Sequence, residues 1–112
     1  MPKPSDRTYS RYAREAMSLL GRMIRIARIE RKLTAAEVAD RAGISRSLLQ
    51  RIVQGDPGSS LGAVFEAAAV VRVPLFEAEP DRLATHSAAA ETKLALLPKA
   101  ARARRRVVKD AF

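Results

Sequence analysis

The stretch AAEVADRAGISRSLLQRIVQ, residues 35–54, decides how this chain folds. It predicts two short helices separated by a sharp turn at Gly43, because glycine readily adopts the left-handed backbone that ends a helix. Ala39 is small enough to lie where two steeply crossing helices approach each other most closely. The apolar residues expected to fill the contact are Val38, Ala42, Ile44, Leu49 and Ile52.

This pattern is typical of a helix-turn-helix, a motif that places its second helix in the major groove of DNA. An ordinary helical hairpin in an all-α core is the alternative. Three features together count against it: the small Ala39, the turn at Gly43, and a polar second helix that begins Ser45-Arg46-Ser47. We therefore predict DNA binding.

The flanking sequence predicts further helices. Residues 10–32 contain apolar residues at helical spacing and no proline. Thr34 and Glu37 have the spacing of a capping box, in which each side chain satisfies a backbone donor of the other residue. The other expected helices are residues 46–54 capped by Ser45, residues 61–71 capped by Ser60, and residues 87–97 ended by Pro98. Phe65 and Phe76 are expected in the core.

The net charge of +9 is concentrated at the two ends of the 112-residue chain. Residues 1–32 carry nine Lys or Arg against three acids, and residues 99–112 carry six against one, whereas residues 33–72 balance at four and four. Such a distribution suits a polyanionic partner. From charge alone, a pair of solvated basic tails is an equal alternative.

Several classes of protein are excluded or disfavoured by composition. The absence of cysteine rules out disulfides and thiolate metal sites. No apolar run approaches the roughly 20 residues of a membrane span, and the N-terminus lacks the apolar part of a signal peptide. The single histidine, His86, has no second ligand nearby. We expect a cytoplasmic protein without metal or cofactor, and no enzyme.

The run from Leu20 to Phe76 resembles the Cro/repressor-type (XRE) family of helix-turn-helix regulators. The matching pieces are LGRMIRIARIERKLT, AAEVADRAGISRSLLQRIVQG and SLGAVFEAAAVVRVPLF. Two positions depart from the family pattern, because Ala35 stands where members often carry Gln and Val53 where they often carry Glu. The resemblance implies that polar bracing around the reading helix is reduced here.

A narrower resemblance is to HipB-like antitoxins, which are small regulators paired with HipA-type kinase toxins. It rests on GDPGSSLGAVFEAAAVVRVPLF, on the later LALLP, and on the ending Asp-Ala-Phe. This resemblance implies a homodimer that binds a palindromic double-stranded DNA operator, represses its own promoter and holds the toxin kinase.

The expected fold class is all-α, a small four- to five-helix repressor-like domain with a helix-turn-helix, a basic N-terminal arm and a basic C-terminal segment. The expected boundaries are 1–14 for the arm, 15–77 for the DNA-binding domain, and 78–112 for an extension that makes dimer or partner contacts.

The candidate DNA-binding residues lie on and around the second helix of the motif. Arg46 and Gln50 are expected to read bases, since Arg pairs with guanine and Gln with adenine. Ser47 and Arg51 share this outward face, and contact with phosphate or solvent alone is equally open for them. Ser45 is a possible phosphate donor, although capping suffices to explain it. The candidates for backbone phosphate contact are Arg28 and Arg41.

The candidate partner-binding residues are apolar side chains in positions expected to face water. Ile26 and Ile29 project from the side of the first helix opposite Ile24. Cover by the chain's own terminal segments and contact with a partner are equal alternatives. The other candidates are Val107, Val108 and Phe112, in the basic C-terminal segment.

Three functions are weighed: an antitoxin that autoregulates its operon, a stand-alone helix-turn-helix repressor, and a basic structural nucleic-acid-binding protein. The first is the preferred hypothesis.

Overall fold

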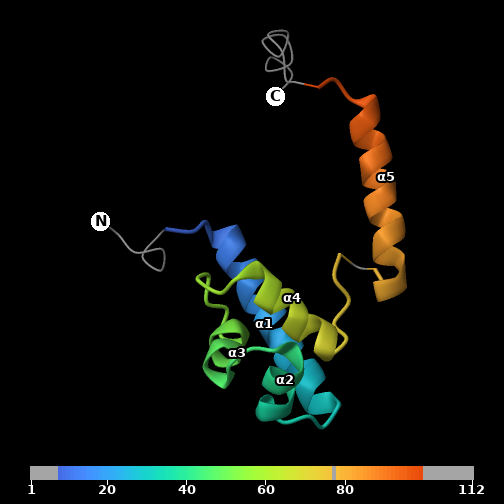
Figure 1. Cartoon of the computed structure of the whole chain (residues 1–112). Helices are drawn as coiled ribbons and strands as arrows, with labels where there is room; N and C mark the ends of the chain where they lie inside the picture. Colours follow the sequence, from blue (N-terminus) through green and yellow to red (C-terminus); the bar gives the residue numbers. More distant parts are fainter. Residues whose placement is uncertain (1–7, 77, 100–112) are drawn as a thin grey trace. The chain divides into compact units, whose positions relative to one another are not determined.

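The computed structural model describes residues 8–76 and 78–99. These residues form two compact units that divide after residue 77, and each unit is described by itself. The first unit contains α1 (Arg11–Glu30), α2 (Ala35–Ala42), α3 (Arg46–Val53) and α4 (Leu61–Val70). The second contains the 3-10 turn η2 (Pro80–Arg82) and α5 (Leu83–Leu96) (Figure 1). The described part of the chain has no strand, which confirms the all-α fold.

Side-chain caps begin each helix of the first unit. The Ser10, Ser45 and Ser60 hydroxyls accept hydrogen bonds from the backbone amides of Ala13, Leu48 and Ala63, at 3.0–3.2 Å. The predicted capping box of α2 is present, because the Thr34 amide donates to Glu37 and the Glu37 amide donates to the Thr34 hydroxyl. These contacts satisfy amide donors that the helix itself leaves free. Helix α1 begins at Arg11, inside the range that the sequence assigned to the arm.

The turn between α2 and α3 has the predicted glycine geometry. Gly43 has φ of 71°, in the left-handed region, and its amide donates to the carbonyl of Asp40. The next amide, of Ile44, donates to the carbonyl of Ala39. The chain therefore turns within the three residues 43–45 that join α2 to α3.

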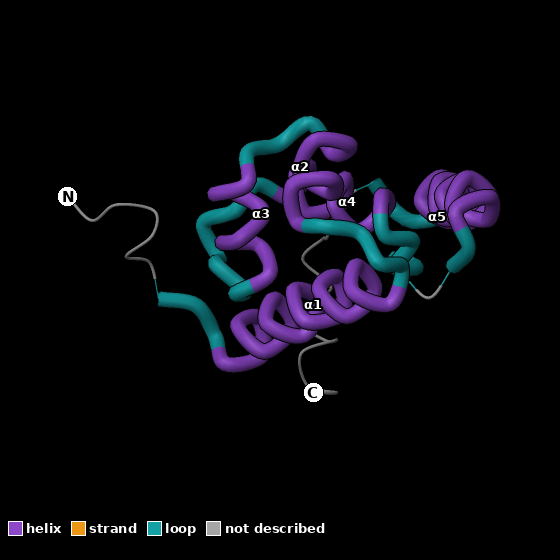
Figure 2. The backbone as a smooth tube through the Cα atoms, turned by 90° about the horizontal axis from the view of Figure 1, so that it is seen from below, coloured by secondary structure: helices purple, strands orange, loops and turns teal. Residues whose placement is uncertain are grey.

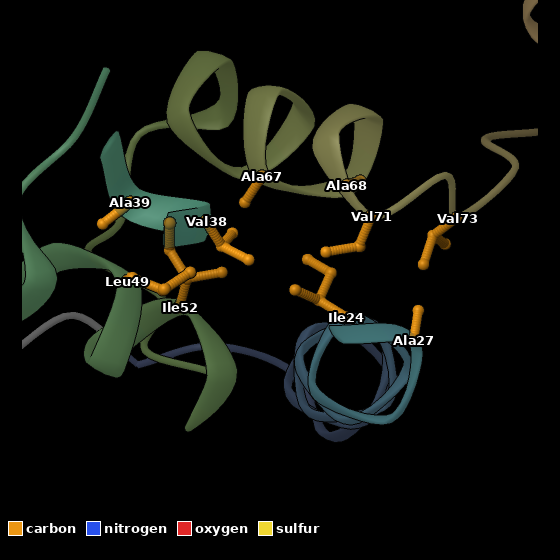
Figure 3. Packing of buried hydrophobic residues seen from close by; sticks show 10 residues of the cluster. All are labelled: Ile24, Ala27, Val38, Ala39, Leu49, Ile52, Ala67, Ala68, Val71 and Val73. Atoms are coloured by element: carbon orange, nitrogen blue, oxygen red, sulfur yellow. The ribbon is translucent and has the colours of Figure 1, made fainter. Parts of the chain in front are cut away.

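In the first unit, α1 lies along one side of α2, α3 and α4 (Figure 2), and side chains of all four helices form the core. Ile24 and Ala27 project from α1 toward the residues that follow α4, where Ile24 faces Val71 and Ala27 faces Val73 (Figure 3). Ala67 and Ala68 of α4 belong to the same core. The motif helices complete the core with Val38, Ala39, Leu49 and Ile52. Ala39 is 2% exposed, as expected for the close approach of α2.

Phe76 corrects one expectation, because it lies outside the core. Its side chain is 78% exposed, and its φ of 57° puts it in the left-handed region. Phe65 is only half-buried and meets the Phe76 ring edge to face, with centroids 6.2 Å apart. Small aliphatic residues pack the core closely without either ring.

Helix α5 begins at Leu83, four residues before its predicted start, and ends at Leu96, just before Pro98. None of its residues is buried. Alanines account for its helicity, since Ala has the highest helix propensity. A helix of 14 residues with no buried side chain is only marginally stable in water.

Candidate nucleic-acid interface

Helix α3 turns its apolar side inward and its polar side toward solvent. Leu49 and Ile52 are 2% and 3% exposed, and Ser45 caps the helix. Because residues three and four apart share a helix face, the polar residues between these anchors must face outward. The predicted reading residues that are exposed here are Arg46, Ser47, Gln50 and Arg51.

A hollow of about 520 Å³ opens between α1 and α3. We call it the arginine hollow, because Arg25 and Arg28 reach it from α1 and Arg46 reaches it from α3. The remaining lining residues are Ala35, Ser47, Leu49, Gln50, Val53 and Gln54. The hollow therefore joins the reading face of α3 to the basic side of α1.

Arg28 has an internal contact that the sequence did not reveal. Its Nη1 atom donates to the carbonyl oxygen of Leu33 at 2.8 Å, and its side chain is half-buried. This bond ties α1 to the loop that leads into α2. A guanidinium with five donors can make this contact and still offer donors to an anion.

Two other candidate arginines are exposed and lie outside the arginine hollow. Arg51 is in the last turn of α3, and Arg41 is in the last turn of α2. Hydrogen bonds from Thr34 hold the pKa of Glu37 below its usual value, and the positive charge of Arg41 adds a smaller effect in the same direction. Arg41 thus contributes to the electrostatics of α2 itself.

Arg25 and Gln54 line the hollow but were not among the predicted site residues. Helical spacing in the sequence could have identified both residues. Arg25 lies one turn before Arg28, and Gln54 lies one turn after Gln50. Residues at such spacing share a helix face, so each extends a surface already named.

The apolar candidates on α1 are exposed. Ile26 and Ile29 are 55% and 53% exposed, so nothing in the described residues buries them. Leu19 and Met23 are also exposed, at 57% and 38%, and continue the apolar surface along the helix. The other partner candidates, Val107, Val108 and Phe112, lie outside the described residues.

Two negative findings apply to the part of the chain that the structure describes. It holds no group of His, Asp or Glu side chains that could bind a metal ion. It also contains no helix with the length and apolar character needed to cross a membrane.

Comparison with known proteins matches residues 19–83 to the helix-turn-helix domain family. No curated protein matches the chain. The matched range runs from the first half of α1 to the start of α5, and it includes the whole of α2, α3 and α4. It also covers more than half of the sequence and contains the motif whose caps, turn and packing are described above. The chain therefore belongs to the helix-turn-helix domain family of DNA-binding regulators.

Proposed function

We propose that this protein is a transcriptional repressor that reads a palindromic operator with α3, acts as a homodimer, and serves as the antitoxin of a HipA-type kinase toxin. One observation carries the DNA-reading part of this proposal. Arg46, Ser47 and Gln50 are exposed together on α3, beside the arginines of α1.

The chemistry of these side chains suits sequence reading. In a helix-turn-helix, the N-terminal residues of the second helix meet base edges in the major groove. Arg46 is the first residue of α3, and Gln50 follows one turn later on the same face. Arg pairs bidentately with guanine, and Gln with adenine. Ser47, between them, can donate to a base or to a phosphate.

Backbone contacts supply the remaining affinity. Arg25 and Arg28 flank α3 across the arginine hollow, and they offer positive charge to a phosphate next to the groove. Arg51 and Arg41 add charge at the ends of α3 and α2. Contacts to phosphate fix the register of the helix on DNA without reading its sequence.

The test is footprinting on the protein's own promoter, followed by titration of the protected site. Arg46→Ala should weaken specific binding about 5- to 150-fold, the equivalent of about 1–3 kcal/mol, while the melting temperature stays nearly unchanged. The matched control is Arg82→Ala, which removes the same charge from an exposed arginine of η2. Unchanged operator affinity for Arg46→Ala would mean that α3 does not read the operator.

Salt dependence separates this function from that of a basic structural protein that coats nucleic acid. The net charge of +9 is the observation that favours the structural protein. A coating protein loses affinity equally for all sequences as salt rises, whereas a reader retains a preference for its operator over competitor DNA.

The exposed apolar surface of α1 supports the homodimer. Leu19, Met23 and Ile26 recur at intervals of four and three residues, the spacing by which one helix packs along another. The arginines of α1 that reach the hollow, Arg25 and Arg28, lie on other sides of the helix. We call Leu19, Met23 and Ile26 the apolar stripe. A dimer formed through the apolar stripe leaves α3 of each subunit free to enter a half-site, and the two half-sites lie one helical turn of DNA (about 34–36 Å) apart.

Sedimentation or light scattering tests the dimer. Ile26→Gln should weaken self-association at least about tenfold, because each subunit loses the burial of one large aliphatic side chain. Leu61→Gln is the control, since Leu61 is an equally large aliphatic residue, 67% exposed, that belongs to α4 and not to α1. Equal dimerisation of both variants would mean that α1 is not the interface.

The antitoxin role predicts a second partner for the C-terminal part of the chain. Helix α5 has no buried residue, so most of its surface is open to a partner. If the gene beside this one encodes a kinase of the HipA type, the two purified proteins should form a stable complex. Failure to bind that kinase would leave a stand-alone repressor.

A further inference from the structure

We propose that the arginine hollow is also a binding site for a small phosphorylated organic molecule, which competes with DNA for the protein. Competition rests on the DNA-reading function proposed above, whereas binding of the small molecule does not depend on it.

The charge of the hollow is uncompensated. Arg25, Arg28 and Arg46 converge on it, and no acidic residue lines it. Among the residues that the structure describes, the only ion pair joins Arg11 to Glu15, at 3.2 Å. Three guanidinium groups around one space attract an anion strongly, and their planar donor pairs match the oxygens of a phosphate.

One of the three arginines is held in place before any ligand arrives. Arg28 is half-buried, and its bond to the Leu33 carbonyl oxygen at 2.8 Å restricts its side chain. Less side-chain entropy is lost when a positioned group binds a ligand, so this contact prepares the site. Arg25 and Arg46 are exposed and complete the site from the rim.

The lining of the hollow is mixed, since the arginines share it with apolar residues that could contact the organic part of a ligand. Leu49 is 2% exposed, and Ala35 and Val53 are half-buried beside it. The amides of Gln50 and Gln54 add polar groups that can donate and accept hydrogen bonds. Small-molecule sites combine apolar surface with polar groups that orient the ligand, and about 520 Å³ lies within their usual range of volume. The fitting ligand combines a doubly charged phosphate with a flat apolar body.

Such a ligand would use side chains that we assign to DNA reading. Arg46 and Gln50 line the hollow and also stand at the reading face of α3. Ligand and DNA therefore exclude each other, and each must lower the affinity of the other by the same factor. The site would let a phosphorylated metabolite release the repressor from its operator.

Phenyl phosphate is the probe, because it joins a dianion to a flat apolar ring. We expect it to bind the full-length protein saturably, one molecule per chain, in calorimetry at about 150 mM salt, where the basic ends of the chain are screened. Arg25→Gln should weaken this binding about tenfold, since a charged hydrogen-bonding partner is lost. Arg22→Gln is the matched control, because Arg22 is an exposed arginine of α1 that does not line the hollow.

Three results would overturn the proposal. The first is the absence of saturable binding up to about 10 mM probe, a weak limit for a specific site. The second is equal probe affinity for Arg25→Gln and Arg22→Gln. The third is a combination of two observations: Arg25→Gln loses operator binding, and the unchanged protein does not bind free probe. This combination would assign the hollow to a DNA backbone phosphate alone. If saturating probe leaves operator affinity unchanged, competition is refuted. Because the calorimetry contains no DNA, failure to bind an operator would not affect its result.

Discussion

Replacement of Gly21 by alanine is the sharpest test of how α1 and α3 pack. Gly21 is buried in the middle of α1. A Cβ atom at this position would lie 2.6 Å from the carbonyl oxygen of Ile52 and 2.8 Å from that of Val53. Ordinary contacts begin at 3.4 Å, so α3 must retreat by about 0.8 Å. The obstacles are backbone atoms, and no side-chain rotation can relieve them.

The free energy of unfolding should fall as a result. Forcing an extra carbon into a packed contact costs about 1–3 kcal/mol, and this clash with backbone belongs at the upper end. Alanine returns up to about 1 kcal/mol through its higher helix propensity. Gly62→Ala measures that gain alone, because Gly62 is in α4 and a Cβ there meets nothing within 4 Å. The difference between the two variants should therefore be about 2–3 kcal/mol.

Urea denaturation followed by circular dichroism measures both variants against the unchanged protein. For a domain of this size, the expected difference corresponds to about 10 °C or more in melting temperature. Operator binding provides a second readout, because α3 must move when Gly21 gains a side chain. If Gly21→Ala is as stable as Gly62→Ala, then α3 does not lie against α1 as described and the packing argument is refuted.

Three further predictions follow from the motif helices and the chain end. Ala39→Glu should destabilise the domain by at least about 3 kcal/mol by burying a charge, whereas Ala36→Glu, at an exposed position of the same helix, should fold normally by circular dichroism. The pKa of Glu37 is lowered in the folded protein from its ordinary value of 4.5. Its carboxylate therefore stabilises the fold at pH values above 4.5, and this stabilisation is lost as the pH falls through the folded pKa. The stability gap to Glu37→Ala should therefore narrow on acidification, and a gap that widens would contradict the capping box. Deleting residues 99–112 should weaken the dimer or the toxin complex at about 150 mM salt, and unchanged size-exclusion and pull-down results would make this segment a purely electrostatic tail.

Local interactions made much of the fold predictable from sequence. A cap joins a side chain to an amide three residues later, so the caps at Thr34, Ser45 and Ser60 could be located without tertiary structure. The left-handed turn at Gly43 is local in the same sense. The alternation of buried and exposed residues in α3 also follows from helical spacing, which is why the exposure of Arg46 and Gln50 could be predicted.

The sequence was less informative where residues distant along the chain meet. Phe76 is apolar and was expected in the core, but the left-handed backbone after α4 leaves its ring exposed. The start of α5 was placed four residues late, because Arg82 at its N-terminus makes no side-chain cap that could mark the boundary. The apolar character of a residue alone does not determine whether its side chain is buried in the core.

By itself, the sequence determined the helices of the motif, their caps and the outward face of α3, since each depends on residues within one or two turns of one another. Only the tertiary structure decided that Gly21 lies against the backbone of α3, that Arg28 bonds to the carbonyl of Leu33, and that Arg25 joins Arg46 around one hollow. The physical reason is that packing sets the distance between α1 and α3. That distance depends on the core side chains of all four helices, and no local pattern in the sequence encodes it.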